Sequence, residues 1–143
     1  MSHESAESAD LVLRGYHAFV AGDLETMESL LDPHVEWVPA AESEAIVVSR
    51  ERVLEVVAER VAEDYHVVVD RAIGLGDRVV VSMRFSRIEL DPSDERPLQS
   101  RRSYLLGRWA AVVQLRDGRV VRVEEHPRLE AALEAAGLED EVA

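Results

Sequence analysis

The segment from 101 to 126 constrains the fold most, because it predicts two long strands joined by one tight turn. The turn is Asp117-Gly118, a pair that accepts the positive φ angles of a type I′ hairpin at low cost. Uninterrupted pairing outward from this turn places Val112 opposite Val123 and Ala110 opposite Glu125. One face then carries an apolar strip that ends in a guanidinium and a carboxylate. Its residues are Arg108, Ala110, Val112, Val121, Val123 and Glu125.

The two faces of this hairpin predict two different environments. We expect the face that carries Glu125 to form the floor of a pocket. The opposite face is too apolar for a solvated sheet surface, so we expect a second copy of the chain to cover it in a homodimer. The residues of that second face are Leu105, Trp109, Ala111, Val113, Leu115 and Val120.

The composition predicts one soluble globular domain over residues 1–143, with its core at about 8–136. The chain has 143 residues and 47% apolar content, which is enough for a sizeable core. It contains no apolar run long enough to span a membrane. The first ten residues are acidic and polar, without the basic and then apolar pattern of a secretion signal, so we expect a cytoplasmic protein.

Several kinds of chemistry are excluded or disfavoured by what the sequence lacks. It has no cysteine, which rules out disulfides, thiolate catalysis and thiolate metal sites. All sixteen basic residues are arginine, so Schiff-base chemistry and a phosphate-binding P-loop lysine are excluded as well. The net charge of −13 disfavours nucleic acid and anionic membranes as partners. The histidines show no metal-ligand spacing, and we expect neither a metal nor a cofactor.

The order of the elements predicts an α+β fold with helices gathered on one face of a curved antiparallel sheet. Apolar spacing predicts helices over about 4–21, 24–31, 49–63 and from Pro127 to Gly137. Alternating β-branched residues predict strands at 34–38, 65–75 and 78–90, before the main hairpin. For the segment 39–48 the sequence leaves three alternatives, namely a loop, a strand or a cover that packs on the core.

Three segments in this order resemble the nuclear transport factor 2-like superfamily and, within it, the SnoaL-like branch. They are AGDLETMESLLDPHVEW, SRERVLEVVAER and DGRVVRVEEH. The resemblance covers about residues 8–136. It implies a cone-shaped fold with an apolar cavity between helices and sheet, commonly in a homodimer joined through sheet surfaces. Members include ketosteroid isomerases, polyketide cyclases, limonene-type epoxide hydrolases, dehydratases and proteins without catalytic activity.

The ketosteroid isomerase pattern is disfavoured by two positions. Trp37 stands where those enzymes carry the proton-abstracting Asp, and an indole cannot move a proton between two carbons. Their oxyanion-stabilising Tyr has its nearest match in Tyr16, which is one residue out of register. Trp37 is expected either to line the cavity or to pack in the core.

The epoxide hydrolase pattern fits in part. Its Arg aligns with Arg84 and its second Asp with Glu125, but its first Asp aligns with Ser86, which cannot act as an acid. Arg84 beside Glu125 would lower the pKa of that carboxyl group, while burial would raise it. The pair is therefore a candidate for catalysis, with a structural ion pair or two solvated side chains as the alternatives.

Two hypotheses follow. In the first, the protein is an acid/base enzyme of the isomerase, cyclase, dehydratase or epoxide hydrolase type, acting on a small apolar organic molecule. Glu125 and Arg84 are then the catalytic candidates, and His66 or His126 could exchange protons near neutral pH. In the second, the protein is a non-catalytic ligand-binding or dimerisation module. The ligand-binding candidates are Tyr16, Trp37, His66, Arg108, Val112 and Val123.

Overall fold

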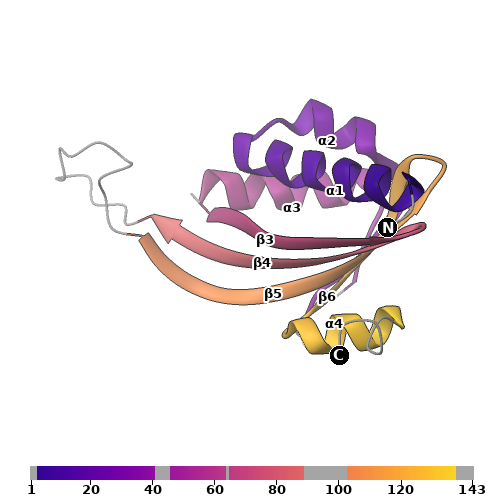
Figure 1. The fold of residues 1–143 in the computed structure, drawn as a ribbon. Helices are drawn as coiled ribbons and strands as arrows, with labels where there is room; N and C mark the ends of the chain where they lie inside the picture. The colour runs from indigo at the N-terminus through magenta and orange to yellow at the C-terminus, as the bar shows by residue number, and fades with distance from the viewer. Residues whose placement is uncertain (1–2, 41–45, 64, 89–102, 138–143) are drawn as a thin grey trace, which may run out of the picture.

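The computed structural model describes residues 3–40, 46–63, 65–88 and 103–137 of the chain (Figure 1). Its helices are α1 (His3–Ala21), α2 (Leu24–Leu30), α3 (Arg50–Ala62) and α4 (Leu129–Ala136). Its strands are β1 (Leu31–Val38), β2 (Val47–Val48), β3 (Tyr65–Leu75), β4 (Arg78–Ile88), β5 (Ser103–Arg116) and β6 (Arg119–His126). The segment 39–48, for which the sequence left alternatives, contains a short strand at 47–48. Residues 41–45, 101 and 102 lie outside the described residues.

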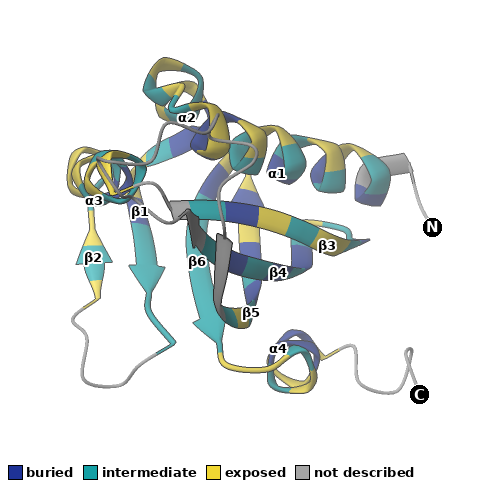
Figure 2. Ribbon diagram, turned by 90° about the vertical axis from the view of Figure 1, so that its left-hand side faces the viewer, coloured by how far each residue is buried: buried dark blue, intermediate teal, exposed yellow. Residues whose placement is uncertain are grey.

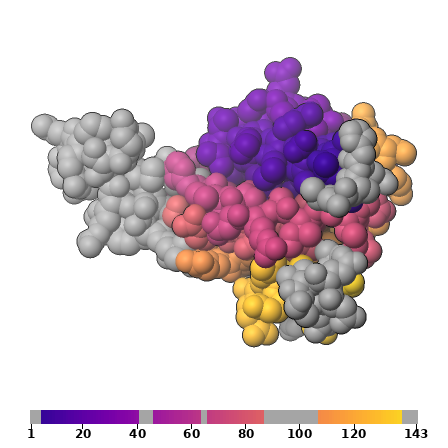
Figure 3. Space-filling model, in the orientation of Figure 1, coloured from indigo at the N-terminus to yellow at the C-terminus, as the bar shows by residue number. Residues whose placement is uncertain are grey.

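The six strands form one curved sheet in the order β2-β1-β6-β5-β4-β3. Helices α1, α2 and α3 lie on one side of it and α4 lies on the other (Figures 1 and 2). We call these sides the pocket face and the outer face. In the space-filling view, α1 lies directly above β3 (Figure 3). The predicted α+β class is confirmed, but the sheet is mixed, because β1 runs parallel to β6.

Helix ends follow the local sequence. Asp23 caps α2, since its Oδ1 accepts a hydrogen bond from the Thr26 backbone N–H at 3.1 Å. The hydrogen bonds from Thr26 also lower the pKa of the Asp23 carboxyl group. Ser49 caps α3 in the same way, and Gly137 ends α4 in the left-handed conformation. None of the helices in the described ranges is long and apolar enough to cross a membrane.

The first turns of α1 are fastened to the β3–β4 turn. The Ser8 hydroxyl donates to the Gly76 carbonyl at 2.7 Å, and the Gly76 N–H donates to Ser5 Oγ at 2.8 Å. Both serines are buried. A Cβ atom at Gly74 would overlap the Ser5 carbonyl, so this approach requires glycine. The contact fixes the direction in which α1 crosses the sheet and presents Tyr16.

The main hairpin has the predicted turn but not the predicted register. Asp117 and Gly118 have φ angles of 53° and 74°, as a type I′ turn requires. Beyond the pair Leu115 and Val120, the register shifts by one residue at a β-bulge. Ala111 therefore lies opposite Glu125, and Val112 lies opposite Glu124.

This bulge corrects the predicted roles of the two hairpin faces. Val123 and Glu125 share the pocket face with the β5 residues Ala111 and Val113, because a one-residue slip moves side chains to the other face. Ala110 and Val112 instead pack against α4 on the outer face. The predicted dimer face is wrong, since it packs into the chain's own core. The core residues concerned are Trp109, Ala111, Val113, Leu115 and Val120, while the Leu105 side chain lies outside the description.

Candidate functional site

A pocket of about 110 Å³ lies between the three helices and the pocket face. Most of its lining is aliphatic or aromatic. These apolar residues include Val12, Phe19, Met27, Leu30, Val35, Val53, Val57, Val67, Met83, Phe85, Val113 and Val123. Four residues bring polar atoms to it, namely Tyr16, Trp37, Arg60 and Glu125. The volume is below the roughly 150 Å³ of an engineered apolar cavity that holds benzene, which points to a compact occupant.

Glu125 reaches the pocket because alternate residues of β6 point to opposite faces. Trp37 arrives beside it from β1, which runs parallel to β6 and pairs Trp37 with Val123. The indole Nε1–H donates a hydrogen bond to Glu125 Oε1 at 2.8 Å. A hydrogen bond to an ionised acceptor is strong and directional, so the indole fixes the position of this carboxylate.

Tyr16 projects from α1 into the same pocket. Burial, and secondly the negative charge of Glu125, raise the pKa of the Tyr16 phenol above its ordinary value. Both causes act against the phenolate. Tyr16 therefore stays protonated at neutral pH and can donate its O–H to an oxygen atom of a bound molecule.

Arg60 is the polar pocket residue that the sequence analysis missed. Its guanidinium carbon lies 5.0 Å from the centroid of the Trp37 ring, within cation–π range. A signal was present, because Arg60 follows Val53 by seven residues and Val57 by three on the inward stripe of α3.

The structure brings four of the predicted site residues together and separates the other four. Tyr16, Trp37, Val123 and Glu125 line the pocket, whereas the remaining four occupy the outer face. Those are His66, Arg84, Arg108 and Val112.

The placement of Arg84 beside Glu125 is wrong. Met83 and Phe85 point into the pocket, so strand alternation turns Arg84 to the outer face. There its Nε donates to Asp70 Oδ1 at 2.9 Å and to Oδ2 at 3.1 Å. Ser86 faces outward for the same reason.

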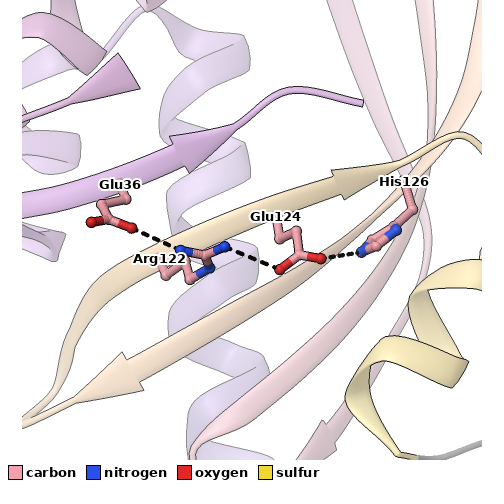
Figure 4. Close-up of polar contacts among 4 residues, drawn as sticks. All are labelled: Glu36, Arg122, Glu124 and His126. Atoms are coloured by element: carbon pink, nitrogen blue, oxygen red, sulfur yellow. Dashed lines mark hydrogen bonds and ion pairs between the residues drawn. The ribbon is translucent and has the colours of Figure 1, made fainter. Parts of the chain in front are cut away.

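The outer face of β1 and β6 carries a chain of charged side chains (Figure 4). Arg122 Nη1 donates to Glu36 Oε2 at 2.7 Å, and Arg122 Nη2 lies 3.4 Å from Glu124 Oε2. His126 Nε2 is buried and lies 3.0 Å from Glu124 Oε1, outside hydrogen-bond geometry, so this contact is ionic when the imidazole is protonated. His126 thus belongs to this row of charged side chains on the outer face and does not line the pocket. In the described part of the molecule, no three His, Asp or Glu side chains gather closely enough to hold a metal ion.

Comparison with known proteins places these features in a family. The family model of the SnoaL-like domain matches residues 12–123, which confirms the predicted resemblance. No curated protein sequence matches the chain.

Solved structures share the fold. Bal32a, from a soil-derived mobile gene cassette, is 24% identical over 87% of this chain and 91% of its own, with a TM-score of 0.69. A putative SnoaL-like polyketide cyclase from Jannaschia sp. CCS1 is 21% identical over 94% of each chain, with a TM-score of 0.68. TerC, co-crystallised with polyporic acid, is 21% identical over 94% of this chain and 98% of its own, with a TM-score of 0.65. At these identities the likeness concerns the fold alone.

Proposed function

The chain belongs to the SnoaL-like domain family, and we propose that it binds a small, mostly apolar organic molecule in the pocket and transfers protons on it. One observation carries this proposal. The Glu125 carboxylate is held by the Trp37 indole at 2.8 Å, in a largely apolar pocket shared with the protonated Tyr16. A carboxylate and a neutral O–H donor in one apolar site form a base and an oxyanion stabiliser.

These two groups suit proton abstraction from a carbon atom next to a carbonyl group. Glu125 would take the proton and become a carboxylic acid, while the C–H electron pair forms the double bond of an enolate. The carbonyl oxygen then carries negative charge and accepts a hydrogen bond from the Tyr16 O–H. In a β,γ-unsaturated carbonyl compound, return of the proton from the Glu125 acid to the γ-carbon gives an isomerisation. Attack of the enolate carbon on a second carbonyl group of the same molecule gives a cyclisation, and the Glu125 acid returns its proton to the new alkoxide.

The other reaction types considered have less support. Water addition of the epoxide hydrolase type needs a second acid beside Glu125, and the described pocket lining contains no other Asp or Glu. The aligned Arg84 and Ser86 both lie on the outer face. A non-catalytic ligand-binding module is the second candidate, because the apolar pocket by itself supports binding. The TerC structure with polyporic acid shows that a protein of this fold binds a small organic molecule.

Deuterium exchange of cyclohexanone tests the base directly. The loss of its α-proton signals in D₂O would be followed by NMR with the wild type, Glu125→Gln and the matched control Glu124→Gln. We expect the wild type and the control to accelerate exchange, and Glu125→Gln to lose about 100-fold of that acceleration. Saturable cyclohexanone binding without faster exchange would favour the non-catalytic candidate, and equal rates for all three proteins would refute Glu125 as the base.

A homodimer stays a proposal, on a different surface from the one predicted. The outer face beyond α4 exposes Val68 at 47% and carries charges of both signs, such as Arg84, Asp70 and Glu36. A face with both charges can complement itself under two-fold symmetry. Sedimentation at micromolar concentration should give twice the 16.0 kDa chain mass, and Val68→Glu should lower it. A monomeric wild type would contradict the proposal.

A further inference from the structure

Arg60 is a cation in the pocket that the proposed proton transfer does not use. Within the part of the chain that the structure describes, its guanidinium makes no hydrogen bond or ion pair. Acidic residues are not scarce, because α3 itself carries Glu51, Glu55 and Glu59. Another arginine of that helix behaves differently, since Arg52 pairs with Glu55 on the exposed side. Arg60 is instead directed to the pocket and to Trp37.

The Trp37 indole satisfies the charge of Arg60 only in part. A cation over an aromatic ring gains only a modest electrostatic attraction at an exposed site. The contact supplies no oxygen acceptor for the guanidinium N–H groups, and an apolar pocket offers few other acceptors. A planar guanidinium binds a carboxylate or a phosphate through two parallel N–H···O bonds. Of these two anions, the smaller carboxylate suits a pocket of about 110 Å³ better. The missing partner therefore has the chemistry of a carboxylate.

Glu125 is not that partner, although it lines the same pocket. It contacts the edge of the indole through Nε1, whereas Arg60 lies over the ring. Two opposite charges thus occupy one pocket without forming an ion pair with each other. A ligand with a negative group at Arg60 can place a neutral C–H at Glu125. A cationic ligand drawn to Glu125 would instead approach the positive charge of Arg60.

We propose that Arg60 determines specificity by binding a carboxylate of the ligand, so that the pocket takes small cyclic carboxylic acids. This inference rests on the proposed function and names its substrate class. The pocket volume of about 110 Å³, which is below that of a cavity that holds benzene, limits the enclosed apolar body to one ring at most. When catalysis occurs, the same molecule carries an enolisable carbonyl group, with its acidic carbon at Glu125 and its carboxylate at Arg60.

Benzoate and benzamide test this inference, because they have nearly the same shape and differ in charge. Both would be titrated by NMR, following the two indole N–H signals, against the wild type, Arg60→Met and Arg52→Met. We expect benzoate to bind about tenfold more tightly than benzamide to the wild type and to the Arg52→Met control. Arg60→Met should abolish that preference, because it weakens the binding of benzoate far more than that of benzamide. Arg60→Lys keeps the positive charge but loses the two parallel N–H donors of the guanidinium group, so it should retain part of the preference for benzoate.

The outcomes separate this inference from the proposed function. Should benzamide bind as tightly as benzoate to the wild type, the carboxylate assignment is overturned while small-molecule binding stands. A benzoate preference that survives in Arg60→Met would also overturn it. If neither compound shifts an indole signal of the wild type, both the inference and small-molecule binding in this pocket fail. If Arg60→Met does not fold, Arg60→Gln and Arg60→Lys carry the same comparison.

Discussion

Glu124 and Glu125 are adjacent in the sequence and are the same amino acid, but their side chains lie in opposite environments. Successive residues of a strand point to opposite faces, so Glu124 joins the ion pairs of the outer face and Glu125 enters the pocket. Glu124 is 33% exposed beside Arg122 and His126. Glu125 is fixed by an indole in largely apolar surroundings. The face of the sheet, and not the residue type, therefore decides which carboxylate can carry chemistry.

The two faces also differ in what they contribute to stability. Exposed ion pairs typically contribute roughly 0–1 kcal/mol and are screened by salt. The pocket face holds most of the buried hydrophobic residues of the described chain, including Val81 and Met83. We therefore expect substitutions on the pocket face to cost more than substitutions on the part of the outer face that α4 does not cover.

The largest expected difference is between two valines. Val81→Ala removes two methyl groups from a side chain with 0% exposure, so we expect a loss of about 2 kcal/mol in the free energy of unfolding. Val68→Ala alters a side chain that is 47% exposed, and we expect a change within about 0.5 kcal/mol. Urea unfolding of both variants at low protein concentration measures the difference. Equal losses would mean that the faces are wrongly assigned.

Trp37→Phe should give the next largest loss in the free energy of unfolding. It keeps an aromatic ring for Arg60 but removes the N–H that donates to Glu125. We expect a loss of about 1.5 kcal/mol, the value of a hydrogen bond to a charged acceptor. Arg122→Met, which breaks two contacts on the outer face, should cost less than about 1 kcal/mol. Urea unfolding decides this too, and a costlier Arg122→Met would reverse the comparison.

Tyr16 makes the pocket face sensitive to alkali. Its folded-state pKa is raised, so above about pH 10 the unfolded chain releases a proton that the folded chain keeps. Stability therefore falls as the pH rises through that range. Tyr16→Phe should reduce the fall by at most about 1.4 kcal/mol per pH unit. Urea unfolding between pH 9 and 11 measures this slope, and an unchanged slope would place the phenol in solvent.

The smallest expected effect concerns salt. Glu124→Gln should change stability by less than about 0.5 kcal/mol in dilute buffer, and by still less at about 1 M NaCl, where charges are screened within about 3 Å. The effect of Glu125→Gln should depend less on salt, because a pocket excludes most ions. Unfolding curves at both salt concentrations check this contrast. Equal salt dependence of the two variants would contradict it.

Much of the fold could be predicted from local signals. Asp23, Ser49 and Gly137 mark helix ends by their own chemistry, and Asp117-Gly118 marks the hairpin turn. The bulge near Val121 could not be predicted, because it adds one unpaired residue without a distinctive residue type. That single residue reversed the assignment of Val112 and of the Trp109 face.

The candidate site could be predicted only in part. Trp37 and Glu125 were found because each aligns with a position that the family resemblance marks, and Tyr16 because it lies one residue from such a position. Arg84 was misplaced, since the alignment gave its position in the strand and the alternation of β4 was not applied to it. Arg60 was missed because a charged residue on a helix rich in acidic residues ordinarily faces solvent.

The most direct test of this account is the ¹⁵N–¹H spectrum of the indole groups. The chain has two tryptophans, and Trp37→Phe assigns the signals of both. We expect cyclohexanone to shift the Trp37 signal in the wild type and in Glu124→Gln. Glu125→Gln should move the same signal even without ligand, because its hydrogen bond to a carboxylate is lost. A Trp37 signal that responds to Glu124→Gln and not to Glu125→Gln would contradict the central claim that Glu125 is the carboxylate of the pocket.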